Sequence, residues 1–430
     1  MAANEPLTNP LGDGESKEQD PFYQRFKYYK CKKPTPDYSQ VIDFYRPENI
    51  KEIGYAYTTV PLGAPMDGLS HQQSMCGLIP PAEWKVYTLD ELPGFSFIKN
   101  PFQPNLHRRI LHRCIHDFPT NRNRCNKLYN DFNLDSIQEN IWDDSLALMR
   151  NDPSLKMKKT LMYKLRWVTL GYHHNWDTKE YSPDDVTSFP SDLAQLSKYI
   201  TNVLGYHTYS PQAAVVNYYR MYSTLAGHQD HSEYDMEAPL LSISFGQPAI
   251  FLLGGDTKDT APAPMFLRDG DIIIMAGPAR KFYHAVPKIL NSKDMEALEV
   301  SNQEFGQKTL DKNLNKDEKN CTNCLQLEEC LSNKTAECFE LGDAKHIAGC
   351  DVDCAKTEIN KNPPGAPGAP KSIEDSMKPC VCNDEPCWNE ATISDADWVL
   401  FEDYLNVTRV NLNVRQVFKP GETFPDKMAS

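Results

Sequence analysis

The sequence contains no long apolar segment and no leader signal. None of its apolar runs approaches the roughly 18 consecutive residues that a membrane-spanning helix requires, so we expect no membrane partner. The first twenty residues, MAANEPLTNPLGDGESKEQD, have no basic stretch followed by an apolar one, which argues against secretion. The 13 cysteines are therefore expected in a reducing compartment, as free thiols or metal ligands rather than disulfides.

An overall excess of basic charge is also absent. The 430 residues carry a formal net charge of −14, which taken alone argues against extensive binding of nucleic-acid phosphate. The charge is unevenly distributed, because residues 301–400 hold 10 Lys and Arg against 19 Asp and Glu. One segment thus supplies most of the acidity, and the total charge is a poor guide to the partner.

Three local runs are nevertheless basic. Residues 22–33 (FYQRFKYYKCKK) hold five Lys and Arg, five aromatic residues and no acid, and they predict a short helix. Residues 154–166 hold five Lys and Arg without an acid, also on an expected helix, and residues 105–128 hold six against one acid. Together these runs could line a phosphate track, although any one basic run is more often the solvated face of a helix.

After residue 210 the sequence consists of short apolar segments separated by turns. The turn signals include Gly254-Gly255 and Asp269-Gly270. Serial strands without intervening helical patterns are typical of a β-sandwich or barrel. The predicted strand segments are AAVVNYYRMY (213–222), PLLSISF (239–245), AIFLLGG (249–255), PMFLRDGDIIIMAG (264–277), FYHAVPKI (282–289) and TRVNLNVRQVF (408–418).

The segment between the last two predicted strands has a different character. It holds nine of the 13 cysteines and the linker NPPGAPGAP at 362–370. A structureless stretch of this length is improbable inside a compact domain, so we interpret 291–399 as an acidic, cysteine-rich insertion. A zinc site is one alternative, since Cys321 and Cys324 form a Cys-x-x-Cys pair with His346 downstream. No second such pair follows at finger spacing, which favours free thiols.

Three residues of the strand-rich region could hold a metal ion. His228 and Asp230 lie two positions apart, so on an extended segment both side chains point the same way. His284 follows at the end of another predicted strand. Two imidazoles and one carboxylate form the facial triad of non-haem Fe(II) oxygenases, but a zinc hydrolase could use the same ligands. On these residues alone, iron, zinc and no metal all stay open.

The final predicted strand favours the oxygenase. In RVNLNVR, two arginines and two asparagines alternate with Val410, Leu412 and Val414. This could be an edge strand with a solvated polar face. However, arginines are costly to bury unless they meet an anion, and the guanidinium fork matches a carboxylate. A metal triad followed by such a strand predicts 2-oxoglutarate, with its 2-oxo acid on iron and its other carboxylate on arginine.

These segments resemble the AlkB family of Fe(II)/2-oxoglutarate-dependent dioxygenases. The resemblance rests on NYYRMYSTLAGHQDHSE, SFGQPAIFLLGG, DGDIIIMAG, the histidine of YHAVP, and RVNLNVRQV, with RWVTLGYHHNWDTKEY and FPSDL upstream. It covers roughly 20–290 and 395–420 and is specific in its His-x-Asp and Arg-x5-Arg motifs.

Carried over by position, the resemblance implies Fe(II) binding by His228, Asp230 and His284, with dioxygen as the other reactant. Arg409 would hold the distal carboxylate of 2-oxoglutarate, Tyr219 would donate to it, and Arg415 would lie nearer the metal. The full set of implied 2-oxoglutarate contacts is Asn217, Tyr219, Arg409, Asn411 and Arg415.

The implied fold is α+β, a double-stranded β-helix (jelly roll) with helices on its outer face, an N-terminal helical extension and the cysteine-rich insertion. The expected domains are a flexible tail (1–20), an N-terminal extension with a nucleotide-recognition lid (21–209), a catalytic core (210–290 with 400–420), the insertion (291–399) and a C-terminal tail (421–430).

A base must leave its stack to reach such a site, so aromatic walls are expected. Trp167 and Tyr172 could equally be core residues. Repair-type relatives carry an acid two residues after the iron-binding aspartate, where this chain has Ser232, which argues against simple direct reversal of base damage. The expected substrate contacts are Trp167, Tyr172, His173, Trp176, Tyr181, Ser232 and Glu233.

The resemblance therefore implies oxidative demethylation or hydroxylation of methylated bases in tRNA or in single-stranded or unpaired DNA. Candidate bases are N1-methyladenine, 5-methylcytosine and N6-methyladenine. A protein (histone) demethylase of the same fold and a catalytically silent nucleic-acid-binding scaffold are the alternatives. We expect a monomer in the nucleus, the cytoplasm or the mitochondrion.

Overall fold

The computed structural model describes residues 20–62, 77–120, 124–125, 140–152, 154–293, 295 and 395–424. The chain divides into two units, Met1–Leu298 with Glu385–Ser430 and Glu299–Asp384, and all described residues belong to the first. Residues 296–394 of the expected insertion, with their nine cysteines, and the expected tail 1–19 lie outside the described residues. Among the helices of the described part, none is both long and apolar enough to cross a membrane.

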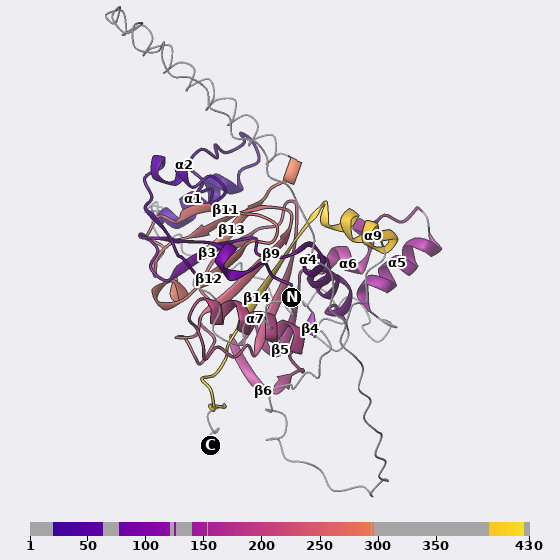
Figure 1. Ribbon diagram of the computed structural model, residues 1–430. Helices are drawn as coiled ribbons and strands as arrows, with labels where there is room; N and C mark the ends of the chain where they lie inside the picture. Colours follow the sequence, from indigo (N-terminus) through magenta and orange to yellow (C-terminus); the bar gives the residue numbers. More distant parts are fainter. Residues whose placement is uncertain are drawn as a thin grey trace, which may run out of the picture. The chain divides into compact units, whose positions relative to one another are not determined.

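Two antiparallel sheets form the core of the fold (Figure 1). The major sheet has the strand order β1-β2-β3-β12-β9-β14-β7-β5-β4, with β6 paired to β5, and the minor sheet has the order β11-β10-β13-β8. The crossovers between non-consecutive strands give the jelly-roll type of double-stranded β-helix. This confirms the predicted core.

The strand segments predicted after residue 210 all form strands. The predicted segment 264–277 is two strands, because Gly270 turns the chain with φ +81° between them. The observed strands are β7 (Ala213–Arg220), β8 (Leu225–His228), β9 (Leu240–Gly246), β10 (Ala249–Leu253), β11 (Ala263–Leu267), β12 (Ile272–Met275), β13 (His284–Ile289) and β14 (Thr408–Arg415).

The last strand of the chain, β14, lies in the middle of the major sheet. β14 pairs with β9 on one side and β7 on the other, so it is a central strand rather than the solvated edge strand of the alternative interpretation. Val410, Leu412 and Val414 are fully buried in the larger apolar cluster together with Leu196 and Ile200 of α7 (Ser191–Val203). The apolar face of β14 therefore packs under the outer helices, and its polar face points into the jelly roll.

The expected N-terminal helical extension is wrong in part, since residues 57–186 contribute six strands. They extend the major sheet on both flanks: β3 pairs with β12, and β5 pairs with β7. Strand β3 was hidden because its partner in the core, β12, lies about 175 residues further along the chain, and β2 joins the sheet by pairing with β3. The six are β1 (Tyr57–Thr59), β2 (Lys85–Leu89), β3 (Phe95–Lys99), β4 (Arg124–Cys125), β5 (Trp167–Asn175) and β6 (Glu180–Val186).

The first basic run forms the predicted helix. In α1 (Pro21–Lys30) the Asp20 carboxylate caps the first turn by accepting from the backbone N–H of Tyr23 at 2.6 Å. Phe22, Phe26 and Tyr29 are buried in an apolar cluster with strands β10 and β13. This leaves the basic residues of α1 on the opposite, outer side.

The single helix expected at 154–166 is wrong. The chain instead makes two short turns, η5 (Met157–Lys159) and α6 (Leu161–Lys164), because Thr160 adopts an extended conformation and caps α6 with its hydroxyl. The remaining helical elements are α2 (Glu48–Glu52), η1 (Pro81–Glu83), α4 (Pro104–His112), the π-helical turn η2 (Arg113–Asp117), α5 (Ile141–Asn151), η6 (Gly277–Lys281) and α9 (Asp395–Leu405).

Candidate active site

The predicted metal ligands converge on one point of the minor sheet. His228 ends β8 and His284 begins β13, and the two residues are direct partners in the antiparallel register. Asp230 follows in the loop after β8, with its Oδ1 3.8 Å from His228 Nε2 and its Oδ2 3.8 Å from His284 Nε2. One ligand atom from each residue lies within 4.8 Å of the other two. Two nitrogens and one oxygen at this spacing can coordinate one ion.

Backbone carbonyls orient both imidazoles. His228 Nδ1 lies 3.0 Å from the carbonyl oxygen of Ala226, and His284 Nδ1 lies 3.1 Å from that of Phe282. When Nδ1 carries the proton and donates to the carbonyl, the Nε2 lone pair is left facing the shared point. Burial, with a further contribution from His228, lowers the pKa of His284 to about 4. The ring is then neutral near pH 7, the form that binds metal.

Two arginines fix the third ligand. Arg415 Nη2 donates to Asp230 Oδ2 at 2.8 Å, and Arg280 Nη1 donates to the Asp230 backbone carbonyl at 2.5 Å. Burial would favour the neutral acid, but Arg415 and the two imidazoles outweigh it and hold the pKa of Asp230 well below its usual range. Asp230 is therefore an ionised, immobilised carboxylate.

Arg409 is a buried cation that has no carboxylate partner among the residues that the structure describes. Its side chain is 1% exposed, Nη1 donates to the carbonyls of Gln247 (3.2 Å) and Leu267 (3.3 Å), and Nη2 donates to Ser244 Oγ (2.6 Å). Its Nε has no hydrogen-bond partner among the described residues. Burial lowers the pKa of Arg409 to about 10, so the group is still cationic near neutral pH. An unsatisfied cation of this kind fits an anionic ligand.

A cavity of about 30 Å³ joins this cation to the metal ligands. Its walls include His228, Asp230, His284, Tyr219 and Arg409. Tyr219 and Arg409 are partners in the register of β7 and β14, which places both side chains on the inner face. A metal site and an unpaired guanidinium thus face one enclosure, as a 2-oxo dicarboxylate bound to iron requires.

The other predicted cosubstrate residues lie in different surroundings. Asn411 also lines the cavity, and its Nδ2 donates to Ser242 Oγ (2.9 Å) and the Ile243 carbonyl (3.1 Å). Arg415 contacts Asp230 at the metal end. Asn217 is the register partner of Asn411 but lines a larger neighbouring cleft instead.

The predicted aromatic walls divide between surface and interior. Trp176 is 43% exposed and packs against Trp167 with ring centroids 5.5 Å apart. Tyr172 packs edge-on against Phe418 at 5.7 Å in a small apolar cluster. His173 is buried, with Nδ1 2.7 Å from Thr169 Oγ1. Of these four, Trp176 is the most exposed and the best placed to meet a ligand.

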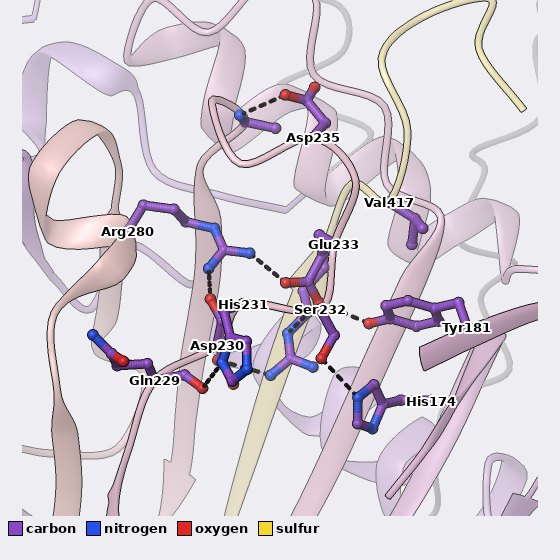
Figure 2. A network of polar contacts seen from close by, with 12 residues as sticks. His174, Tyr181, Gln229, Asp230, His231, Ser232, Glu233, Asp235, Arg280 and Val417 are labelled. Atoms are coloured by element: carbon purple, nitrogen blue, oxygen red, sulfur yellow. Dashed lines mark hydrogen bonds and ion pairs between the residues drawn. The ribbon is translucent and has the colours of Figure 1, made fainter. Parts of the chain in front are cut away.

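The residues after Asp230 form a buried polar network, shown in Figure 2. Glu233 accepts from Arg280 Nη2 at 2.6 Å and from the Tyr181 hydroxyl at 2.7 Å. Burial opposes its ionisation, but Arg415 and Arg280 hold the pKa of Glu233 below its usual range. Ser232 Oγ lies 2.9 Å from His174 Nε2. Tyr181 and Glu233 therefore brace the loop that carries Asp230 against the β5–β6 hairpin.

Sequence reasoning missed His174 and Arg280. A glycine within a strand is typical of a local irregularity, and Gly171 in β5 could have pointed to one. It has φ +71°, and the pairing register shifts just after it, between Tyr172 and His174. Simple alternation therefore could not tell which of the two adjacent histidines faces Ser232. Arg280 lies in a turn after β12 and had no pattern that could reveal its contacts with Asp230 and Glu233.

Comparison of the sequence with known protein families points to the same class of enzyme as this site. The family described as "2OG-Fe(II) oxygenase superfamily" matches residues 94–321. The triad, the enclosed arginine and the jelly roll agree with that match.

Curated relatives narrow the assignment. "Nucleic acid dioxygenase ALKBH1" of Mus musculus is 40% identical over 291 residues, covering 65% of this chain and 72% of the relative. "tRNA demethylase abh1" of Schizosaccharomyces pombe is 29% identical over 67% of this chain and 92% of the relative. "DNA N(6)-methyladenine demethylase ALKBH1A" of Arabidopsis thaliana is 33% identical over 50% and 70%, respectively. The chain belongs to the AlkB family of Fe(II)/2-oxoglutarate-dependent dioxygenases.

Proposed function

We propose that this dioxygenase oxidises methyl groups on bases of tRNA or of single-stranded or unpaired DNA. The observation that carries the catalytic part is the His228–Asp230–His284 triad in one cavity with Arg409, whose Nε has no partner within the described part of the chain. The names of the relatives, which specify tRNA and DNA demethylation, support the substrate class. N1-methyladenine, N6-methyladenine and 5-methylcytosine are the bases to test.

Each side chain has a separate part in this reaction. When bound at the triad, Fe(II) with 2-oxoglutarate and dioxygen supplies the oxidising chemistry that hydroxylates a methyl group and yields succinate and carbon dioxide. Arg409 would hold the distal carboxylate of 2-oxoglutarate, because it lines the cavity and its Nε has no hydrogen-bond partner among the described residues. Arg415 and Arg280 keep Asp230 in its ligating position. On an N-methyl group, the hydroxylated product releases formaldehyde and leaves the unmethylated base.

The loop after Asp230 argues against simple direct reversal of base damage as the function. Ser232 occupies the position of the acid that repair-type relatives carry, and it contacts His174. The next acid, Glu233, is buried and paired with Arg280. No carboxylate other than the ligand Asp230 is thus offered to a base by residues 230–233.

The substrate is tested with methylated tRNA stem-loops, methylated single-stranded DNA and methylated histone peptides, each incubated with Fe(II) and 2-oxoglutarate. We expect mass spectrometry to show loss or oxidation of the methyl group on a nucleic acid, together with succinate. Asp230→Ala should abolish both products because it removes one of three ligands. Turnover of histone peptides alone would favour the protein-directed alternative, and no turnover of any nucleic acid would refute the proposal.

The cell compartment and the oligomeric state belong to the same proposal. We propose that the enzyme works in the nucleus, the cytoplasm or the mitochondrion, where tRNA and DNA occur, and that it is a monomer. Fractionation of cells and sedimentation of the purified chain test these two points.

A further inference from the structure

A second, much larger cleft lies beside the candidate active site. It has a volume of about 1580 Å³ and is bordered by the end of α1, the turn from β7 to β8, the end of β13 and residues 158–167. Among the described residues, its lining includes five lysines and two arginines but no aspartate or glutamate. We refer to it as the basic cleft, defined by Lys30, Lys32, Lys33, Lys158, Arg166 and Lys288.

Two distant parts of the chain supply these charges. Lys30, Lys32 and Lys33 come from the basic run at the end of α1, and Lys158 and Arg166 come from the run at 154–166. The packing of Phe22 and Phe26 against β10 and β13 fixes the position of α1. Lys288 of β13 adds a further charge beside the first run, since its Nζ donates to the Cys31 carbonyl at 2.9 Å.

Described residues of the third basic run contact other parts of the protein instead. Arg113 forms ion pairs with Asp117 and Asp192 at 2.9 Å each, and Arg108 lies over the ring of Trp398. None of the described residues of 105–128 lines the basic cleft. The cleft thus draws its charge from the other two basic runs, with Lys288 and Arg220.

Aromatic side chains are interleaved with these charges. Tyr222, in the β7–β8 turn, is 80% exposed, and Lys32 Nζ lies 4.3 Å from the centre of its ring. Tyr38, Tyr163 and Trp167 also line the cleft. Lysines that track a backbone, together with aromatic faces on which bases stack, are the pattern of proteins that bind single-stranded nucleic acid. An anionic membrane or an acidic peptide would not need the stacking surfaces.

The basic cleft and the catalytic cavity share part of their walls. Tyr219 and Leu225 line both enclosures. Trp167 lines the cleft and packs against Trp176 of the β5–β6 hairpin. A strand held in the cleft would therefore present a neighbouring nucleotide to the triad.

We propose that the basic cleft binds the phosphates and bases of an unpaired nucleic-acid strand that flanks the methylated nucleotide. The proposal rests on the function proposed above and names the surface that holds the rest of that substrate. Several phosphates bound by lysines give an affinity that falls steeply with salt, by a slope of roughly 0.7 per phosphate for a single strand.

The test compares two triple variants of the full chain. The cleft variant is Lys32→Gln with Lys33→Gln and Lys158→Gln, all exposed residues of the cleft. The control variant is Lys85→Gln with Lys198→Gln and Lys419→Gln, which makes the same change in net charge at exposed lysines outside it. Thermal unfolding of both variants verifies that the fold is kept.

Fluorescence anisotropy measures binding of a labelled, unmodified single-stranded oligonucleotide at several salt concentrations. We expect the cleft variant to bind about tenfold or more weakly, with its salt slope reduced by about 2, and the control to bind within about twofold of the wild type. Tyr222→Ser should weaken binding without changing the salt slope, because it removes stacking rather than charge.

Three results would overturn the proposal: wild-type affinity and slope in the cleft variant, an equal loss in the control variant, or displacement of the oligonucleotide by a polyglutamate peptide of equal charge. This experiment is separate from the test of function because the oligonucleotide carries no methyl group. Strong, cleft-dependent binding by an enzyme that demethylates no base would refute the proposed function and leave the cleft proposal standing.

Discussion

At the scale of single residues, the candidate active site depends on which buried arginines are paired with a carboxylate. Arg409 has neutral partners for Nη1 and Nη2 and none for Nε, whereas Arg415 is paired with Asp230. Two arginines on the same face of β14 therefore have different functions. Arg409 is available to bind an anionic cosubstrate, and Arg415 positions the metal-binding carboxylate of Asp230.

Arg409→Lys tests the first of these parts. Lysine keeps the charge but loses the planar fork, so we expect the KM for 2-oxoglutarate to rise by about 10- to 100-fold with a smaller change in kcat. Steady-state succinate formation at varied 2-oxoglutarate measures both. Arg268→Lys is the matched control, because that arginine pairs with Asp43 outside the cavity at 2.8 Å. An unchanged KM in the Arg409 variant would contradict the assignment.

At the scale of secondary-structure elements, α1 is fitted closely to the strand that carries His228. A Cβ at Gly227 would lie 2.6 Å from the Phe22 ring, and one at Gly254 would lie 2.9 Å from it. The two glycines allow the ring to reach strands β8 and β10. The position of the metal ligand is therefore coupled to the packing of the N-terminal helix.

Gly227→Ala should destabilise the protein by about 1–3 kcal/mol, since the added methyl group overpacks this contact. Replacing the aromatic ring with a smaller side chain in Phe22→Leu should restore about 1 kcal/mol of the lost stability in the double variant. Urea unfolding of the two single variants and the double variant gives the coupling energy. Strictly additive effects would show that the two residues do not press on each other.

A histidine–carboxylate cluster at the junction of α4, η2 and α5 responds to pH. His116 Nδ1 lies 2.7 Å from Asp117 Oδ1, and its Nε2 lies 3.2 Å from Asp143 Oδ2. The hydrogen bond to Asp117, opposed by burial and assisted by Asp143, raises the pKa of His116. Its contribution to stability is then fully present below the unfolded pKa of about 6.5 and is lost as the pH rises through the higher folded value.

His116→Gln should therefore cost more stability at pH 6 than at pH 9. We expect a difference of about 1 kcal/mol between the two conditions, since the side chain is partly exposed. Urea unfolding at both pH values measures it, with His207→Gln at an exposed position as the control. A cost that is the same at pH 6 and pH 9 would exclude this linkage.

At the scale of the whole described molecule, one buried arginine joins three distant segments. Arg220 of β7 donates to the backbone carbonyls of Met162 (2.6 Å) and Tyr163 (2.8 Å). It also donates to the hydroxyls of Tyr404 and Thr408, both at 2.8 Å. Arg220 thereby attaches the described C-terminal segment, residues 395–424, to α6 and to the core strand β7.

Arg220→Met should destabilise the protein by about 2–4 kcal/mol, because it leaves several buried acceptors without a donor. Arg150→Met, at an exposed position of α5, should change stability by less than about 0.5 kcal/mol. Denaturant unfolding measures both. Equal stabilities of the two variants would show that Arg220 does not bind these segments together.

Local patterns in the sequence predicted a large part of the fold and the candidate site. The period-two pattern of RVNLNVR predicted that Val410, Leu412 and Val414 share a face opposite Arg409, and their burial confirms it. The spacing of His228 and Asp230 predicted that they could act together. The nucleotide contacts and the domain limits are still predictions. The shared face of β14 and the proximity of His228 to Asp230 both depend on neighbours within a few residues, which the covalent chain itself places, and metal binding by this pair stays a prediction.

The sequence by itself determined which residues could bind a metal and a dicarboxylate, and which runs were basic. Only the tertiary structure decided that Glu233 pairs with Arg280, that His174 faces Ser232, and that Arg409 Nε has no partner. It also decided that two of the three basic runs meet in one cleft. These facts depend on strand register and on the packing of segments 47 to 257 residues apart, which no local pattern specifies.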